Sequence, residues 1–223
     1  MQERLDKYIS NLWIASRSVT RKFVREGFAQ VNDVNIFKPD FKVSEGDIIN
    51  FNEEIIPVKK GITILLHKPA WYVSSDIDDG HHFSYKKLLK NCPYKDLVKI
   101  AWRLDVDTEW LLVLCSDGKK IHQIISPKKG KEKIYIADIE KKILEQDIKK
   151  LENPMEIDNY TTLWAKIERI WDKKIQISVK EWKFHQIKKM LESVNNKVLC
   201  LKRISVWKYK LWDLKKWEWK YVN

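Results

Sequence analysis

The chain has 223 residues, 44% of them hydrophobic, so it can bury the core of one large domain or of two smaller ones. Lysine and arginine outnumber aspartate and glutamate by 43 to 31, and the net charge of +12 favours a polyanionic partner such as nucleic acid or an anionic membrane surface. No apolar run approaches the roughly 20 residues of a membrane span and no signal-peptide segment precedes the first predicted helix, so we expect a cytoplasmic protein without membrane segments.

The first 60 residues are predicted to form a small unit with a basic helix. Its expected elements are helices over residues 3–12 and 17–26 and strands over residues 28–32, 35–37 and 47–51. Arg17, Arg21 and Arg25 recur every four residues, so their guanidinium groups share one helix face. Lys22 lies beside them. With no acidic partner one turn away on that face, we interpret this stripe as a polyanion-binding surface rather than a merely solvated face.

Residues 61–223 are predicted to alternate strands with helices, which indicates an α+β or α/β unit. The expected strands cover residues 62–66, 111–115, 133–139, 163–170, 174–179 and 198–206, and the expected helices cover 84–89, 119–125, 145–151 and 184–194. The three cysteines are too far apart in the sequence for a zinc motif, and the five histidines form no ligand pattern, so we expect reduced thiols and no metal site.

The run from Trp102 to Trp110 places one carboxylate, Asp105, beside Arg103 in an otherwise strongly apolar segment. An aspartate in a polar loop before a buried strand is most often a turn residue or a cap. Asp107 and Glu109 have the character of structural carboxylates. Residue types alone therefore do not make Asp105 catalytic.

Several segments, taken together and in order, resemble known families. Arg4-Leu5-Asp6-Lys7-Tyr8, Ala15-Ser16-Arg17-Ser18 and Val31-Asn32 resemble the small RNA-binding domain named after ribosomal protein S-four. Residues 64–222 resemble the RsuA family of pseudouridine synthases. The segments that carry this second resemblance are His67-Lys68-Pro69, Arg103-Leu104-Asp105-Val106-Asp107-Thr108-Glu109, Ser126-Pro127-Lys128, Lys133-Ile134-Tyr135 and Phe184-His185-Gln186-Ile187-Lys188-Lys189-Met190.

The resemblance implies a cofactor-independent RNA uridine isomerase acting on small-subunit (16S) ribosomal RNA. It implies an α+β fold, with an RNA-binding domain over residues 1–60 and a catalytic domain with a central mixed, mainly antiparallel sheet over 61–223. Asp105 matches the catalytic aspartate, which can act as a nucleophile or hold a proton. Tyr135 matches an aromatic platform for the flipped base, and Lys188 matches a basic residue that pairs with the aspartate. Arg103 is expected to support the loop or contact phosphate.

The expected partner is ribosomal RNA or a small-subunit assembly intermediate, bound by a monomer. The predicted RNA contacts are Arg4, Lys7, Arg17, Arg21, Lys22, Arg25, Lys68, Lys128, Lys129, Lys133, His185, Gln186 and Lys189. His185-Gln186 and Lys189-Met190 favour the small-subunit branch over the sister branch that modifies large-subunit RNA. A catalytically impaired RNA-binding or ribosome-assembly protein is the alternative from another class.

The sequence departs from the family pattern mainly by one exchange, tryptophan in place of glycine. It occurs at Trp13, Trp71, Trp102, Trp110, Trp182, Trp207, Trp212 and Trp217. Glycine at these eight positions would bring the glycine count from 6 to 14, close to the roughly 16 expected at about 7%. We hypothesise that UGA codons meaning glycine in the source are written as tryptophan. The alternative is real substitution that damages the enzyme, with Trp102 and Trp110 crowding Asp105.

Overall fold

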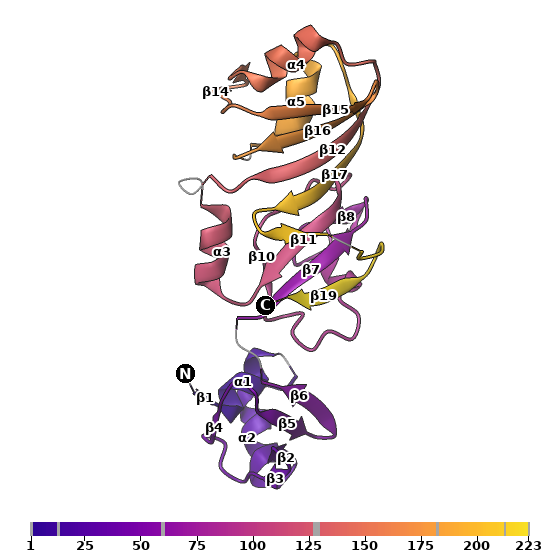
Figure 1. The fold of residues 1–223 in the computed structure, drawn as a ribbon. Helices are drawn as coiled ribbons and strands as arrows, with labels where there is room; N and C mark the ends of the chain where they lie inside the picture. The colour runs from indigo at the N-terminus through magenta and orange to yellow at the C-terminus, as the bar shows by residue number, and fades with distance from the viewer. Residues whose placement is uncertain are drawn as a thin grey trace.

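The computed structural model describes residues 2–12, 14–58, 61–126, 130–181, 183–211 and 213–222, and over these ranges the chain has the predicted α+β fold. A small unit built from the N-terminal residues lies at one end of the molecule, and a long twisted sheet occupies the rest (Figure 1). Helices α4 (Glu145–Glu152) and α5 (Gln186–Glu192) lie at the far end of that sheet, and α3 (Gly118–Ile125) lies beside its middle strands.

The N-terminal unit packs two helices against a four-stranded sheet. Its elements are β1 (Glu3–Arg4), α1 (Leu5–Asn11), α2 (Arg17–Arg25), β2 (Ala29–Val31), β3 (Val34–Asn35), β4 (Lys42–Val43), β5 (Ile48–Phe51) and β6 (Glu54–Pro57). The sheet order is β3-β2-β5-β6, and β1 pairs with β4. Helix α2 begins where the Ser16 hydroxyl accepts a hydrogen bond from the Val19 N–H, a standard N-cap. Both predicted helices are confirmed, although the first begins two residues later than expected.

The main sheet has the order β15-β16-β12-β17-β11-β7-β19. Its strands are β7 (Thr63–Lys68), β10 (Lys99–Ile100), β11 (Glu109–Cys115), β12 (Lys133–Ile139), β15 (Lys166–Trp171), β16 (Lys174–Val179), β17 (Val198–Val206), β18 (Tyr209–Lys210) and β19 (Trp219–Val222). Two further short strands extend the sheet: β10 pairs with β11, and β18 pairs with β17. All these pairs are antiparallel except β11 with β17, so the predicted mixed, mainly antiparallel sheet is confirmed.

Burial explains which strands are central. Every residue of β7 is buried, as are the last five of β11, because both faces of these strands are covered. Strand β12 alternates instead, with Tyr135, Ala137 and Ile139 buried on one face. Short pieces complete the fold: β8 (Tyr72–Val73) with β9 (Phe83–Ser84), β13 (Glu156–Ile157) with β14 (Tyr160–Thr161), and the 3-10 helix η1 (Tyr85–Leu88).

Three predicted elements differ from the structure. The expected helix over 84–89 is the single 3-10 turn η1, and the expected strand over 163–170 begins only at Lys166. The expected helix over 184–194 begins at Gln186, because His185 has a left-handed backbone (φ 54°) that an α-helix cannot continue. The C-terminal strands β18 and β19 were not predicted.

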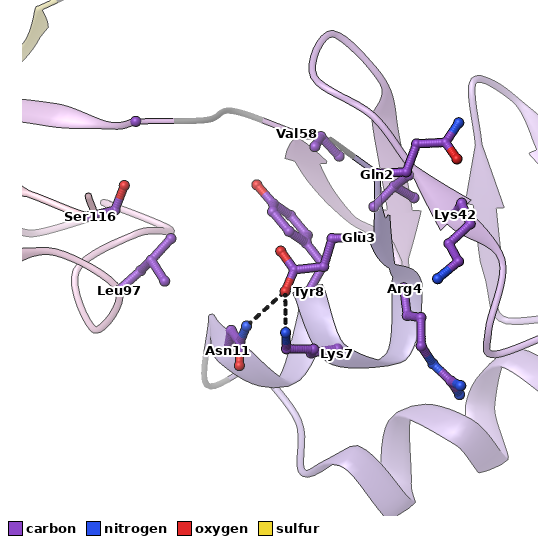
Figure 2. Close-up of a pocket in the computed structure, with 12 residues that line it drawn as sticks. Gln2, Glu3, Arg4, Lys7, Tyr8, Asn11, Lys42, Val58, Leu97 and Ser116 are labelled. Carbon is purple, nitrogen blue, oxygen red and sulfur yellow. Dashed lines mark hydrogen bonds and ion pairs between the residues drawn. The ribbon is translucent and has the colours of Figure 1, made fainter. Parts of the chain in front are cut away.

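The two units share one hydrophobic core. Leu5 and Tyr8 of α1 belong to the same buried cluster as Leu89 and Tyr94 of the larger unit. Burial raises the pKa of Tyr94, and a hydrogen bond with Tyr8 raises it further. A cavity of about 430 Å³ lies along this seam, with Tyr8 and Lys7 facing Leu97 and Ser116 across it (Figure 2). The predicted domain boundary lies between residues 60 and 61, and Lys59 and Lys60 lie outside the described residues.

Four of the suspected glycine positions have the backbone that glycine favours. The φ angles are 69° at Trp71, 86° at Trp110, 53° at Trp207 and 74° at Trp217. A β-carbon in this left-handed region costs on the order of 1 kcal/mol per residue. Trp102 has no positive φ, and Trp13, Trp182 and Trp212 lie outside the described residues. Trp219, which fits the family pattern as tryptophan, has no positive φ, and neither have Trp164 and Trp171, for which the sequence left the choice between tryptophan and glycine open.

Replacing a left-handed tryptophan by glycine should therefore stabilise the fold. We expect Trp71→Gly to raise the free energy of unfolding by about 1 kcal/mol, measured by urea denaturation. Trp171→Gly is the matched control, because Trp171 is similarly exposed (72% against 63% for Trp71) but lies in strand β15 without positive φ. It should lower the free energy of unfolding. An equal change of the same sign in both variants would contradict the glycine hypothesis, as would UGG codons at the eight positions.

Candidate functional site

Asp105 lies in the loop between β10 and β11, where its side chain is only 11% exposed. The loop is fixed on both sides of it. Ser74 holds the preceding residue, since its hydroxyl donates to the Leu104 carbonyl (2.8 Å) and accepts from the Leu104 N–H (3.0 Å). The Asp105 carbonyl accepts from the Thr108 N–H at 3.1 Å, which closes a turn. The sequence therefore places this carboxylate on a rigid turn at the start of a buried strand.

Two basic side chains, from α5 and the residue before it, approach the carboxylate. Lys188 Nζ lies 3.5 Å from Asp105 Oδ2, and His185 Nε2 lies 3.9 Å from the same oxygen. The structure thus brings the predicted pair Asp105 and Lys188 together. Lys188 nevertheless binds Asp107 more closely, at 2.7 and 2.9 Å from its two oxygens. Asp107, predicted to be structural, therefore shares the ammonium group with Asp105.

Tyr135 lies beneath this site as a fully buried residue of β12. Burial raises the pKa of its hydroxyl, and the positive charge and hydrogen bond of Arg203 oppose that change. The charge of Asp105 also raises the pKa, so the carboxylate acts on the phenol electrostatically. Because the ring is fully buried, the predicted stacking of a base on Tyr135 requires the side chains that cover it to move.

Arg203 of β17 is the residue that the sequence analysis missed. It is fully buried, and its guanidinium donates to the carbonyls of Leu111 (2.8 and 3.0 Å), Trp102 (3.0 Å) and Arg103 (3.2 Å). Burial lowers its pKa, against the effects of Tyr135 and Asp105. One signal was available: Arg203 occupies an inward position of an alternating strand, between Leu201 and Ser205, where a charge needs a partner.

Three predicted RNA contacts are buried, and for these the structure corrects the prediction. Lys68 Nζ donates to the carbonyls of Pro69 (2.9 Å), Tyr72 (2.8 Å) and Val106 (3.1 Å), so it supports the Asp105 loop from below. Burial lowers its pKa to about 7. Lys133 Nζ donates to the Lys180 carbonyl at 2.9 Å and lies over the Trp102 ring, and burial lowers its pKa to about 8.

Gln186 is the third buried residue among the predicted contacts. Its amide oxygen accepts from the Lys183 N–H (3.0 Å), and its amide nitrogen donates to Glu181 Oε1 (3.0 Å). These bonds shape the turn that precedes α5. Gln186 therefore orders the segment that carries His185 and Lys188, and does not face solvent.

The arginine stripe of α2 has an acidic partner that the sequence analysis did not find. Asp6 of α1 is fully buried and binds Arg4 (3.0 Å to each oxygen), Arg17 (3.3 Å) and Arg21 (2.7 Å). Burial alone would raise the pKa of Asp6, but these hydrogen bonds outweigh it and hold the pKa far below its usual range. Repulsion within the stripe is thus relieved inside the unit, although three arginines on one carboxylate still leave an excess of positive charge.

The remaining predicted contacts lie on or near the surface. Lys7 pairs with Glu3, Lys22 with Glu26 and Lys189 with Asp158, while Arg25 is exposed. Lys128 and Lys129 lie outside the described residues. Arg103 is exposed and lines a groove of about 680 Å³ together with His122, Lys180 and Lys183. Arg103 is two residues before Asp105 in the sequence, so the groove lies next to the Asp105 loop. Among its charged residues, Arg103, Lys180 and Lys183 outnumber the single carboxylate of Glu181.

Within the described residues, the structure shows neither a metal-binding cluster nor a membrane-spanning helix. No group of three or more histidine, cysteine or carboxylate side chains there could hold a metal ion. Nor is any helix of those ranges long and apolar enough to cross a bilayer.

Comparison with known proteins agrees with this geometry. Residues 62–193 match the RNA pseudouridylate synthase family. A pseudouridylate synthase of known crystal structure superposes with a TM-score of 0.69 and 28% identity, over 99% of this chain and 96% of that one. The ribosomal large subunit pseudouridine synthase B of Bacillus subtilis is 30% identical over 90% of this chain and 84% of its own length. The ribosomal small subunit pseudouridine synthase A of Haemophilus influenzae is 30% identical, over 90% and 87%.

The fold and these matches together define an isomerase that converts uridine to pseudouridine. The chain belongs to the RNA pseudouridylate synthase family. The matched range contains Asp105, Tyr135 and Lys188, so the three residues placed together by the structure all lie in the part of the chain that defines the family.

Lys68 should make the stability of the protein depend on pH in a definite direction. Its pKa is about 7 in the folded chain against an ordinary value of 10.5, so the unfolded chain binds more protons between these pH values. The free energy of unfolding therefore rises with pH across this window. We expect this rise in the wild type to be steeper than in Lys68→Met, measured by urea denaturation from pH 7 to 10. Lys149→Met, at an exposed position of α4, should leave the slope unchanged; identical slopes in all three proteins would contradict the role of Lys68.

Arg203 should contribute strongly to stability through the loop it holds. Arg203→Met leaves one buried and two partly buried carbonyls without this donor, and we expect a loss of about 3 kcal/mol in the free energy of unfolding. Arg103→Met is the control, because Arg103 offers only its backbone carbonyl to the same network. It should change stability by less than about 0.5 kcal/mol. Equal losses of unfolding free energy in the two variants would show that the hydrogen bonds of the Arg203 guanidinium do not stabilise the loop.

Proposed function

We propose that this chain converts a uridine of small-subunit ribosomal RNA to pseudouridine, with Asp105 as the catalytic carboxylate. One observation carries the assignment of Asp105: it is a nearly buried carboxylate, held on a rigid turn, with Lys188 and His185 within 4 Å of its Oδ2. Carboxylates in such surroundings are typical of sites that do acid–base or nucleophilic work.

The reaction breaks the N-glycosidic bond and joins the same ribose carbon to C5 of the base, so it consumes no oxidant or reductant. The proton on C5 leaves to solvent, and N1 gains a proton. Asp105 can serve as the nucleophile on ribose or base, or as the group that holds a proton while the detached base turns. Lys188 and Asp107 position the carboxylate, and Arg203 holds the loop that carries it.

The N-terminal unit, residues 1–60, is proposed to bind RNA next to the catalytic domain. Arg17 and Arg21 keep nearly half of their side-chain surface exposed while Asp6 fixes their orientation, and Arg25 is exposed on the same helix. A pre-oriented guanidinium loses less conformational freedom when it binds phosphate. The shared core of the two units supports a fixed spacing between these cations and Asp105. We further propose that the enzyme acts as a monomer in the cytoplasm.

A large-subunit target is the second candidate, because the Bacillus subtilis relative is named for large-subunit RNA and is as similar as the Haemophilus influenzae relative named for small-subunit RNA. The residue pairs His185-Gln186 and Lys189-Met190 favour the small-subunit branch. Gln186 contributes to this preference through the shape of the turn, since its side chain is buried.

Tritium release from RNA labelled at C5 of uridine tests both assignments. We expect release from small-subunit RNA and none from large-subunit RNA. Asp105→Asn should lower the single-turnover rate at least about a hundredfold, because the reacting carboxylate is lost. Asp107→Asn is the matched control, since Lys188 keeps Asp105 as a partner, and its rate should fall less than about tenfold. Equal losses in the two variants would overturn the assignment of Asp105, and release from large-subunit RNA alone would overturn the target.

A further inference from the structure

Phe184 and His185 form an exposed aromatic pair at the edge of the site. Their rings are stacked, with centroids 3.8 Å apart and planes inclined by 20°. Phe184 is 70% exposed, although it is a large apolar side chain. An aromatic ring held in the open has no role in the core of this fold. The ring is therefore accessible to a ligand on the surface that His185 and the Lys189 side chain leave open.

The backbone that carries this pair is strained and held in place. His185 has a left-handed conformation (φ 54°, ψ 28°), which non-glycine residues adopt at a cost. The two hydrogen bonds of the buried Gln186 side chain, to Lys183 and Glu181, maintain the turn. This conformation places His185 Nε2 at 3.9 Å from Asp105 Oδ2. The aromatic pair is thus fixed at a constant distance from the reacting carboxylate.

The charges near the pair suit a phosphate backbone. Lys189 Nζ lies 5.2 Å from the centre of the Phe184 ring, and Lys183 is exposed one residue before Phe184. Arg103 and Lys183 both line the neighbouring groove, which links this surface to the Asp105 loop. An aromatic face with cations beside it matches the chemistry of single-stranded RNA, in which bases stack and phosphates pair with lysine.

We propose that Phe184 and His185 are a stacking platform for an unpaired base that neighbours the reacting uridine. The inference rests on the proposed function and extends it. A uridine that leaves a helix to reach Asp105 also leaves its neighbours without a stacking partner. Phe184 supplies the missing partner, and its position beside His185 sets which neighbour it receives. The platform is thereby a determinant of the sequence and structure around the target.

The test is a cycle between protein and RNA variants, read by steady-state tritium release at limiting enzyme. The RNA is a fragment of small-subunit ribosomal RNA that contains the converted uridine, either intact or with an abasic nucleotide beside that uridine. Phe184→Leu keeps an apolar side chain without a π-face, and Phe184→Tyr keeps the ring. Trp171→Leu is the matched control, because it removes another exposed aromatic, 72% exposed, at the end of β15.

We expect Phe184→Leu to raise the apparent KM for intact RNA about tenfold, with Phe184→Tyr and Trp171→Leu near wild type. An abasic nucleotide at one of the two positions beside the uridine should raise the KM of the wild type by a similar factor. The same replacement should leave the KM of Phe184→Leu almost unchanged. The platform is refuted if Phe184→Leu matches the wild type, or if each abasic effect persists undiminished in Phe184→Leu. Wild-type protein that releases no tritium would instead refute the proposed function. The affinity of Phe184→Leu and wild type for the same RNAs, measured by fluorescence anisotropy, would then decide the platform separately.

Discussion

The hydrogen bonds of the buried Arg203 are the constraint on which the site depends. They tie the carbonyls of Trp102 and Arg103 in the Asp105 loop, and that of Leu111 in β11, to strand β17. The β11 and β17 strands are also the one parallel pair of the main sheet. A guanidinium presents its five N–H donors in one rigid plane, so it fixes the directions of the carbonyls that it binds. The loop therefore takes its position from the centre of the sheet as well as from Ser74, Lys68 and its own turn.

Around these hydrogen bonds, basic side chains approach the Asp105 loop from two sides. Lys68 and Arg203 support the loop from within the protein, while Lys188 and His185 approach Asp105 from the α5 side. The internal cations have lowered pKa values because they are buried, so the loop is held by groups that carry a cost in stability. Such a cost is common where a fold must hold a reactive group in one geometry.

Hydrophobic periodicity in the sequence predicted most helices and strands. It could not predict which side chains contact one another in the folded chain. The buried strands β7, β11 and β12 were accessible because each is an apolar or alternating run in the sequence, and Asp105 was singled out because the motif around it is contiguous. Asp6 was missed as the partner of the arginine stripe because it lies on a different helix, and spacing within α2 cannot reveal it. Lys68, Lys133 and Gln186 were assigned to RNA from their residue types, but burial depends on how distant strands pack. The left-handed backbone of His185 likewise has no signal in composition.

The left-handed tryptophans have a consequence for how this protein can be made. A ribosome that reads UGA as a stop signal would end the chain at position 13, before helix α2 begins, and would yield a fragment without a sheet. A ribosome that reads UGA as tryptophan would produce the full length, with indoles at Trp71, Trp110, Trp207 and Trp217, where the left-handed backbone carries a cost for any side chain. If UGA codons stand at the eight positions, a synthetic gene with glycine codons there avoids both outcomes in a standard host.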